Sequence, residues 1–127
     1  MAQRTVLLVE DNEYNRKIVR RLLSRSSYRL VEAQDGEAGV ALAFQELPDL
    51  ILMDVQLPKM SGLDATRALS ADVRTKHIPI IVITSFALSG DRERAASAGA
   101  AGYIAKPFSP AELLAMVQGF LPEKLDD

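Results

Sequence analysis

The sequence predicts an α/β fold, a doubly wound five-stranded parallel sheet flanked by five helices. Short apolar runs recur along the chain, and segments with helical periodicity separate them. The runs are continuously apolar rather than alternating, which is typical of strands buried on both faces. Because crossovers between parallel strands are right-handed, such a repeat places helices on both sides of one sheet.

Five segments are expected to form the strands. Three of them are continuous apolar runs at 6–9, 50–53 and 80–83, and a shorter run lies at 102–105. The segment 28–33 mixes polar and apolar residues, so we expect it at the edge of the sheet. A doubly wound sheet of this size is commonly ordered 2-1-3-4-5, with its functional crevice at the carboxyl ends of the strands, and we expect that order here.

Helices are expected between and after these strands, at 15–25, 37–46, 63–71, 91–98 and from about 110 to 121. The last of them opens with Ser109-Pro110-Ala111-Glu112, a capping box with proline at the first helical position. Gly99 is expected to end the fourth helix.

The helix expected at 15–25 is amphipathic. Its apolar face consists of Ile18, Val19, Leu22 and Leu23. We expect the opposite, basic face to be exposed to solvent: Arg16, Lys17, Arg20, Arg21 and Arg25. The simplest interpretation of these charges is a hydrated helix surface.

The composition indicates one domain and excludes several kinds of site. With 127 residues, of which 48% are hydrophobic, the chain can form one domain, 1–127, with a core from about 5 to 121. The net charge of -2 gives no cationic excess for binding nucleic acid or an anionic membrane. The chain has no cysteine and one histidine, His77, which excludes a disulfide framework and argues against a zinc site.

No segment approaches the roughly 20 consecutive apolar residues that a membrane span requires. The N-terminus runs into the first expected strand without an apolar signal region. We therefore expect a cytoplasmic protein that does not bind membranes.

Polar residues stand where the predicted strands end. Glu10 and Asp11 follow the first strand, Asp54 ends the third, Thr84 ends the fourth, and Lys106 follows the fifth. In a parallel sheet these positions meet at one edge, so three acids, a hydroxyl and an amine are expected to lie together. Crowded carboxylates repel one another unless a cation intervenes, and Mg²⁺ prefers oxygen ligands. The sequence therefore predicts a metal site there.

This combination fits phosphoryl transfer to a carboxylate. Asp54 would be the nucleophile, while the metal and Lys106 neutralise the phosphoryl oxygens. Thr84 could donate its hydroxyl to the bound phosphoryl group. Taken singly, each acid could instead cap a helix or turn, and Lys106 could be an ordinary surface lysine. The shared position at one sheet edge favours the functional interpretation.

Four motifs stand in order along the chain: Val-Glu-Asp-Asn at 9–12, Leu-Met-Asp-Val-Gln-Leu-Pro-Lys-Met-Ser-Gly at 52–62, Ile-Thr-Ser at 83–85 and Ala-Lys-Pro-Phe at 105–108. Together they resemble the receiver domains of two-component response regulators, the CheY-like group with a flavodoxin-like fold. The resemblance covers residues from about 5 to 121.

The resemblance implies that Asp54 is phosphorylated by a histidine kinase or a histidine phosphotransfer protein. It implies that Glu10, Asp11, Asp54 and the backbone carbonyl of Gln56 hold Mg²⁺, with Mn²⁺ as the alternative ion, and that Lys106 contacts the phosphoryl group. Such a domain catalyses its own phosphorylation and dephosphorylation and is not a turnover enzyme.

The same resemblance assigns a switch. Thr84 and Tyr103 would be the paired switch residues, and the face formed by the fourth helix, fifth strand and fifth helix would bind a downstream protein. The chain would be a monomer or a phosphorylation-dependent dimer. A cis peptide bond is expected before Pro107.

Other positions refine the resemblance. The segment 84–91 resembles stand-alone, DivK-like receivers and those attached to hybrid kinases. Gln56 and Phe86 occupy positions that influence the lifetime of the phosphoryl group, and Ser85 stands where the family often carries alanine.

Three other functions are open from the residues. A phosphohydrolase with an aspartyl nucleophile usually has a second acid two positions later, where this chain has Gln56. A nucleotide- or flavin-binding module would need a glycine-rich loop after Val9, which is absent from the sequence. A scaffold that acts without phosphorylation would keep the acids unused.

Overall fold

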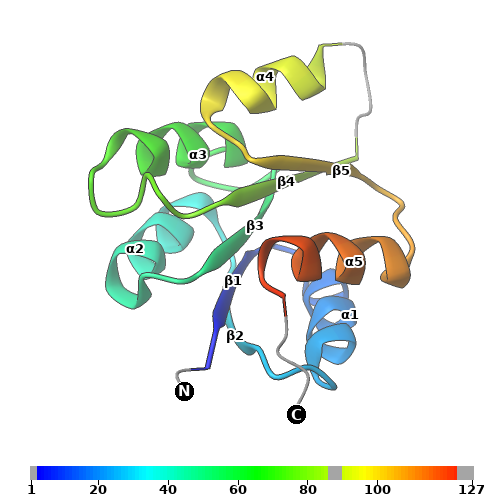
Figure 1. Ribbon diagram of the computed structural model, residues 1–127. Coiled ribbons are helices and arrows are strands. Elements are labelled where there is room, and N and C mark those ends of the chain that lie inside the picture. The colour runs from blue at the N-terminus through cyan, green and yellow to red at the C-terminus, as the bar shows by residue number, and fades with distance from the viewer. Residues whose placement is uncertain (1–2, 86–89, 123–127) are drawn as a thin grey trace.

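Five parallel strands form one sheet in the order β2-β1-β3-β4-β5 (Figure 1). The computed structural model describes residues 3–85 and 90–122. The strands are β1 (Thr5–Val9), β2 (Arg29–Ala33), β3 (Leu50–Asp54), β4 (Ile80–Thr84) and β5 (Gly102–Ala105). The predicted fold class, strand order and edge position of the second strand are confirmed.

Helices cover both faces of the sheet. They are α1 (Glu13–Leu23), α2 (Gly36–Glu46), α3 (Gly62–Ala71), α4 (Asp91–Ala98) and α5 (Pro110–Phe120). Figure 1 shows α1 and α5 together on one side and α2 and α3 on the other, with α4 beyond α3. Right-handed crossovers place helices on both faces when successive strands are added first toward one edge of the sheet and then toward the other. Here β2 lies on one side of β1, and β3, β4 and β5 lie on the other side, so the direction of strand addition changes between β1 and β3.

Alternating residues of each strand form two cores, as the pleat requires. Val6 and Leu8 of β1 face the core under α1 and α5, where Leu113 and Val117 are fully buried. Leu7 and Val9 face the core under α2, α3 and α4. Because every residue of β3 and β4 is buried, these strands read as continuous apolar runs in the sequence.

Local signals set the helix ends. The predicted capping box is present: Ser109 Oγ accepts from the Glu112 N–H, and the Glu112 side chain accepts from the Ser109 N–H. The first helix was expected at 15–25 but begins at Glu13, because the Asn12 side chain accepts a hydrogen bond from the Asn15 N–H at 3.0 Å and acts as its N-cap.

The prediction that Arg16 is exposed to solvent is wrong. Arg16 is only 6% exposed, whereas Ile18, assigned to the buried face, is 39% exposed. The Arg16 guanidinium can be buried because the Glu10 carbonyl and the carboxylates of Glu13 and Glu32 surround it. The other basic residues of the expected exposed face, Lys17, Arg20, Arg21 and Arg25, are exposed.

Some expectations concern residues that the structure does not describe. Phe86 and the rest of 86–89, the middle of the 84–91 segment that carries the resemblance to DivK-like receivers, lie outside the described residues. Across residues 3–85 and 90–122, no helix has both the length and the apolar character needed to cross a membrane.

Candidate functional site

Three carboxylates meet at the carboxyl end of the sheet. Glu10 and Asp11 follow β1, and Asp54 is the last residue of β3. The two strands are parallel neighbours, with Val9 opposite Met53, so their ends lie side by side. One carboxylate oxygen from each acid lies within 4.8 Å of the others. Glu10 and Asp54 are each 4% exposed, whereas Asp11 is open to solvent.

Lys106 reaches the acids from the far side of β4. Its backbone N–H donates to the Thr84 carbonyl at 2.7 Å, which fixes the chain just after β5. Its ammonium lies 3.0 Å from Glu10 Oε1 and 3.2 Å from Asp54 Oδ2. Burial acts to lower the pKa of Lys106, but the hydrogen bond to Glu10 and the charge of Asp54 outweigh it, so the pKa lies above its ordinary value. Lys106 is therefore a permanent cation of the site.

Both buried acids are held in the same way. In each, one carboxylate oxygen accepts from Lys106 and the other from a backbone N–H two residues later in the chain. Asn12 N–H donates to Glu10 Oε2 at 3.2 Å, and Gln56 N–H donates to Asp54 Oδ1 at 3.2 Å. These bonds fix the orientation of the two carboxylates while leaving the lone pairs of Asp11 open to solvent.

The donor set fits a hard divalent cation. Two of the three carboxylates, those of Glu10 and Asp54, contact one ammonium, so the cluster of Glu10, Asp11 and Asp54 has more acids than cations, which favours a further cation. All three offer oxygen ligands, which Mg²⁺ and Mn²⁺ prefer, and exposed Asp11 leaves access for an ion and its waters.

Gly62 allows the start of α3 to lie against the end of β3. Its N–H donates to the Val55 carbonyl at 2.9 Å. A Cβ at this position would lie 1.9 Å from the Asp54 carbonyl oxygen and 2.9 Å from the Val55 Cα. Only glycine fits, so the 52–62 motif has a steric role at the site in addition to supplying Asp54.

Thr84 and Tyr103 lie on the same face of the sheet but at different positions along their strands. Thr84 ends β4, is 2% exposed and stands opposite Ala105 in register. Tyr103 stands opposite Val82, two positions nearer the amino end of the strands, and packs against the core under α4. The guanidinium of Arg92 on α4 lies over the Tyr103 ring, 5.3 Å from its centroid. This cation–π contact had no signal in the sequence.

The Lys106–Pro107 peptide bond is cis, as expected. Beside it lies a cavity of about 440 Å³ bordered by Glu10 and Lys106. Its walls are mainly apolar: Leu8, Ile18, Val19, Ile83, Pro107 and Phe108. Glu10 and Lys106 therefore lie at the edge of a hollow that could receive an apolar group.

The chain matches a known family over most of its length. The model of the response regulator receiver domain matches residues 6–118. Among curated proteins, the polar-differentiation response regulators DivK of Brucella anthropi and Brucella ovis are each 42% identical to this chain over 118 residues, which are 93% of this chain and 96% of each relative.

Solved structures agree in fold and sequence. The receiver domain of the sensor histidine kinase PA1611 from Pseudomonas aeruginosa, crystallised with a magnesium ion in its active site cleft, is 40% identical, with a TM-score of 0.86 over 94% of this chain and 98% of that one. Chemotaxis protein CheY4 of Vibrio cholerae is 30% identical, with a TM-score of 0.87 over 94% and 99% of the two chains. The chain therefore belongs to the response regulator receiver domain family, the CheY-like signalling domains of two-component systems.

Proposed function

We propose that this chain is a single receiver domain, residues 1–127, that accepts a phosphoryl group on Asp54 and passes the signal to a protein partner. The observation that carries the proposal is the setting of the Asp54 carboxylate, which is buried at the end of β3, 3.2 Å from the Lys106 ammonium and within 4.8 Å of oxygens of two further acids. Receiver domains of this family are signalling domains rather than turnover enzymes.

The residues present account for the transfer step. A carboxylate oxygen of Asp54 attacks the phosphorus of a phosphohistidine donor in line with the P–N bond. An O–P bond forms as the P–N bond breaks, and the imidazole nitrogen leaves with the electron pair. Gln56 N–H holds Asp54 Oδ1 during this step, and Lys106 offers its charge to the phosphoryl oxygens.

The proposed metal ligands are the side chains of Glu10, Asp11 and Asp54 and the backbone carbonyl of Gln56. When bound, Mg²⁺, or Mn²⁺ in its place, would supply positive charge that neutralises the phosphoryl oxygens. The magnesium ion in the cleft of the Pseudomonas receiver domain, at 40% identity, supports this choice.

The output is assigned to a switch that runs from Thr84, at the carboxyl end of β4, to Tyr103 on β5. Thr84 would donate its hydroxyl to the phosphoryl group, and Tyr103 would change its packing in response. Its ring lies between β5 and α4, so this change would alter the face of α4, β5 and α5 that we propose as the surface for a downstream protein. The chain would act as a monomer or as a phosphorylation-dependent dimer.

The phosphoryl donor would be a histidine kinase or a histidine phosphotransfer protein, and the site of action the cytoplasm. The balance of 15 basic and 17 acidic residues supports a protein partner rather than nucleic acid or a membrane. The apolar cavity bordered by Glu10 and Lys106 gives a donor protein a place to seat an apolar side chain beside these two residues of the site.

Intact-protein mass spectrometry after incubation with acetyl phosphate and Mg²⁺ tests the proposal. We expect one phosphoryl adduct per chain, lost in Asp54→Ala and in a chelator, and retained in the control Asp64→Ala, which removes an exposed aspartate of α3. An adduct that persists in Asp54→Ala would refute the assignment. Sustained hydrolysis of a phosphomonoester that Asp54→Asn abolishes would show a phosphohydrolase instead.

A further inference from the structure

Arg16 joins the main chain of the acidic site to a network of charges on the outside of the fold. Within residues 3–85 and 90–122 it is the one buried basic side chain. It lies in the first turn of α1, and its Nη1 donates to the carbonyl oxygen of Glu10 at 2.8 Å. That contact is itself buried, so solvent does not compete for it.

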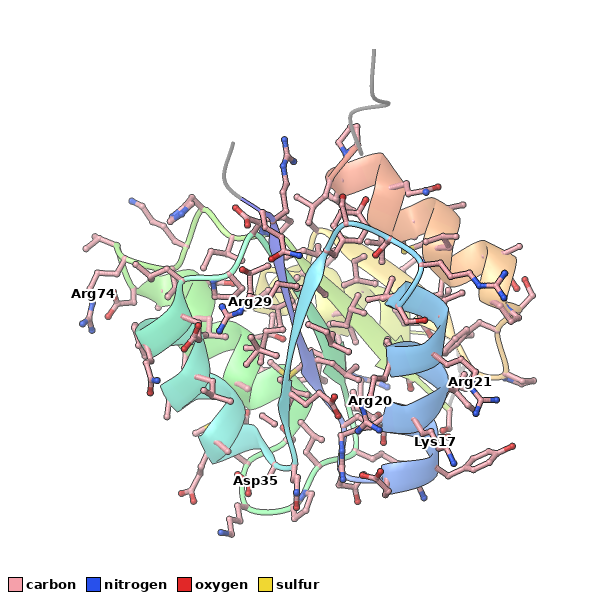
Figure 2. The ribbon with its side chains drawn as sticks, turned by 90° about the horizontal axis from the view of Figure 1, so that it is seen from below. Lys17, Arg20, Arg21, Arg29, Asp35 and Arg74 are labelled. Carbon is pink, nitrogen blue, oxygen red and sulfur yellow. The ribbon has the colours of Figure 1, made fainter. Side chains whose placement is uncertain are left out.

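The other nitrogens of the guanidinium are also engaged. Arg16 Nη2 lies 2.5 Å from Glu13 Oε1, and Nε lies 3.5 Å from Glu32 Oε1 on β2. Glu32 is in turn held by Arg20, whose Nε and Nη2 donate to its two oxygens at 2.8 and 2.7 Å. Figure 2 shows Arg20 directed from α1 toward β2, whereas Lys17 and Arg21 extend away from the sheet. Glu13 and Glu32 therefore hold the Arg16 guanidinium on the side away from the Glu10 carbonyl.

The carbonyl that Arg16 binds belongs to the peptide group between Glu10 and Asp11. On the other side of Glu10, its N–H donates to the Ala33 carbonyl of β2 at 3.0 Å. The main chain of Glu10 is thus held at both ends, by β2 and by Arg16. The plane of the Glu10–Asp11 peptide determines the direction in which both carboxylates leave the chain, so Arg16 acts on both acids at once.

We infer that Arg16 is a positioning residue for the divalent cation: it fixes the Glu10–Asp11 peptide so that both acids face Asp54. The inference rests on the metal site of the proposed function. This role requires the planar guanidinium of arginine, because one group must contact a carbonyl and two carboxylates that lie in different directions. The ammonium of a lysine, on its flexible side chain, does not reproduce these three contacts. Loss of the guanidinium loosens the acids, and the cation binds more weakly.

Mn²⁺ affinity of the unphosphorylated protein tests this. Free Mn²⁺ is measured by electron paramagnetic resonance in wild type, Arg16→Met, Arg16→Lys and the control Lys17→Met, which removes an exposed cation from the same helix. We expect the dissociation constant to rise about tenfold in both Arg16 variants. Lys17→Met keeps the wild-type value. Circular dichroism and thermal unfolding in a chelator establish the folded fraction of each variant.

A purely structural role predicts a different pattern. Arg16→Met would then unfold at a lower temperature, but its folded fraction would bind Mn²⁺ as wild type does, and that result overturns the inference. Wild-type affinity in folded Arg16→Lys also overturns it, and this variant decides the matter where Arg16→Met does not fold. If the wild-type protein does not bind Mn²⁺, the inference is also refuted.

The acetyl phosphate adduct separates this inference from the proposed function. Wild type that binds Mn²⁺ but forms no adduct on Asp54 refutes the proposed function and leaves the role of Arg16 to be decided by the affinities. Wild type that forms the adduct, with Arg16 variants of unchanged Mn²⁺ affinity, refutes the positioning role alone.

Discussion

The ammonium of Lys106 lies 3.2 Å from Asp54 Oδ2, although the two residues are 52 positions apart in the chain and β4 lies between their strands. The same ammonium contacts Glu10 at 3.0 Å. Before any phosphoryl group arrives, Lys106 is thus the counter-ion of two buried carboxylates. In the proposed function, the same position would let it contact a phosphoryl oxygen on Asp54 afterwards.

Lys106→Met should destabilise the protein in a chelator by about 1–3 kcal/mol, because Glu10 and Asp54 would be left buried beside each other without a cation. Addition of Mg²⁺ should raise the stability of this variant more than that of wild type, and the Asp54 adduct should form more slowly. Denaturant unfolding with and without Mg²⁺ measures the first effect. Lys59→Met, at an exposed lysine 3.8 Å from Asp35, is the control. Equal stabilisation by Mg²⁺ in variant and wild type would contradict the counter-ion role.

Thr84→Val should separate phosphorylation from switching. Thr84 is 2% exposed, and valine has nearly the same shape, so the fold should be retained at a cost of about 1 kcal/mol. The adduct on Asp54 should still form, but the amide chemical-shift changes at Tyr103 and along α4 should shrink, because the variant lacks the hydroxyl that is proposed to bind the phosphoryl group. Undiminished changes at Tyr103 would show that the signal reaches β5 by another route.

Gly62→Ala should damage the site by steric overlap alone. A methyl group there meets the Asp54 carbonyl oxygen at 1.9 Å, so either α3 or Asp54 must move, at a cost of about 1–3 kcal/mol. Adduct formation should fall with stability. The matched control is Gly119→Ala in α5, where no atom lies within 4 Å of the new Cβ and where alanine should stabilise the helix by about 0.5–1 kcal/mol. Wild-type stability of Gly62→Ala would contradict the packing described here.

The Arg20–Glu32 pair should make stability dependent on pH in the acid range. The hydrogen bond from Arg20 lowers the pKa of Glu32 below its ordinary value of 4.5, although burial acts in the opposite direction. Because the folded pKa is lower than the unfolded one, this stabilisation is present above pH 4.5 and disappears as pH falls through the folded value.

Glu32→Gln should therefore be less stable than wild type by about 1 kcal/mol at neutral pH, since the pair is partly exposed. The difference should shrink as the solution is acidified below pH 4.5. Thermal unfolding of both proteins across this range measures it. A difference that stays constant, or grows on acidification, would show that charge on Glu32 is not what stabilises the contact.

The sequence was sufficient to predict the parallel sheet and to predict that Glu10, Asp11 and Asp54 lie close together. Strands that are buried on both faces must be apolar throughout, so Ile51 and Val82 mark their strands without any tertiary information. Asp54 and Thr84 then stand out as the first polar residues after such runs, and parallel strands place their ends at one edge. These inferences depend on local pattern and topology alone.

The burial of Arg16 could not be predicted from the sequence in the same way. Helical periodicity places it near Lys17 and Arg20, and charge alone then suggests exposure. Its burial depends on acceptors from other elements, namely the Glu10 carbonyl and Glu32 on β2, which come close only in the folded chain. The same is true of the Arg92 contact with the Tyr103 ring and of the overlap that excludes a side chain at Gly62.

Locating the phosphoryl group on the chain is the most direct test of the central claim. An acyl phosphate is reduced by borohydride to the alcohol, so a phosphorylated aspartate becomes homoserine, which tandem mass spectrometry identifies at one position. After treatment with acetyl phosphate and Mg²⁺, we predict homoserine at position 54, unreduced aspartate at position 11, and unreduced glutamate at position 10, whose own reduction product would be 2-amino-5-hydroxypentanoic acid. Reduction at another acid, or no reduced residue in a protein that carries the adduct, would contradict Asp54 as the phosphoacceptor.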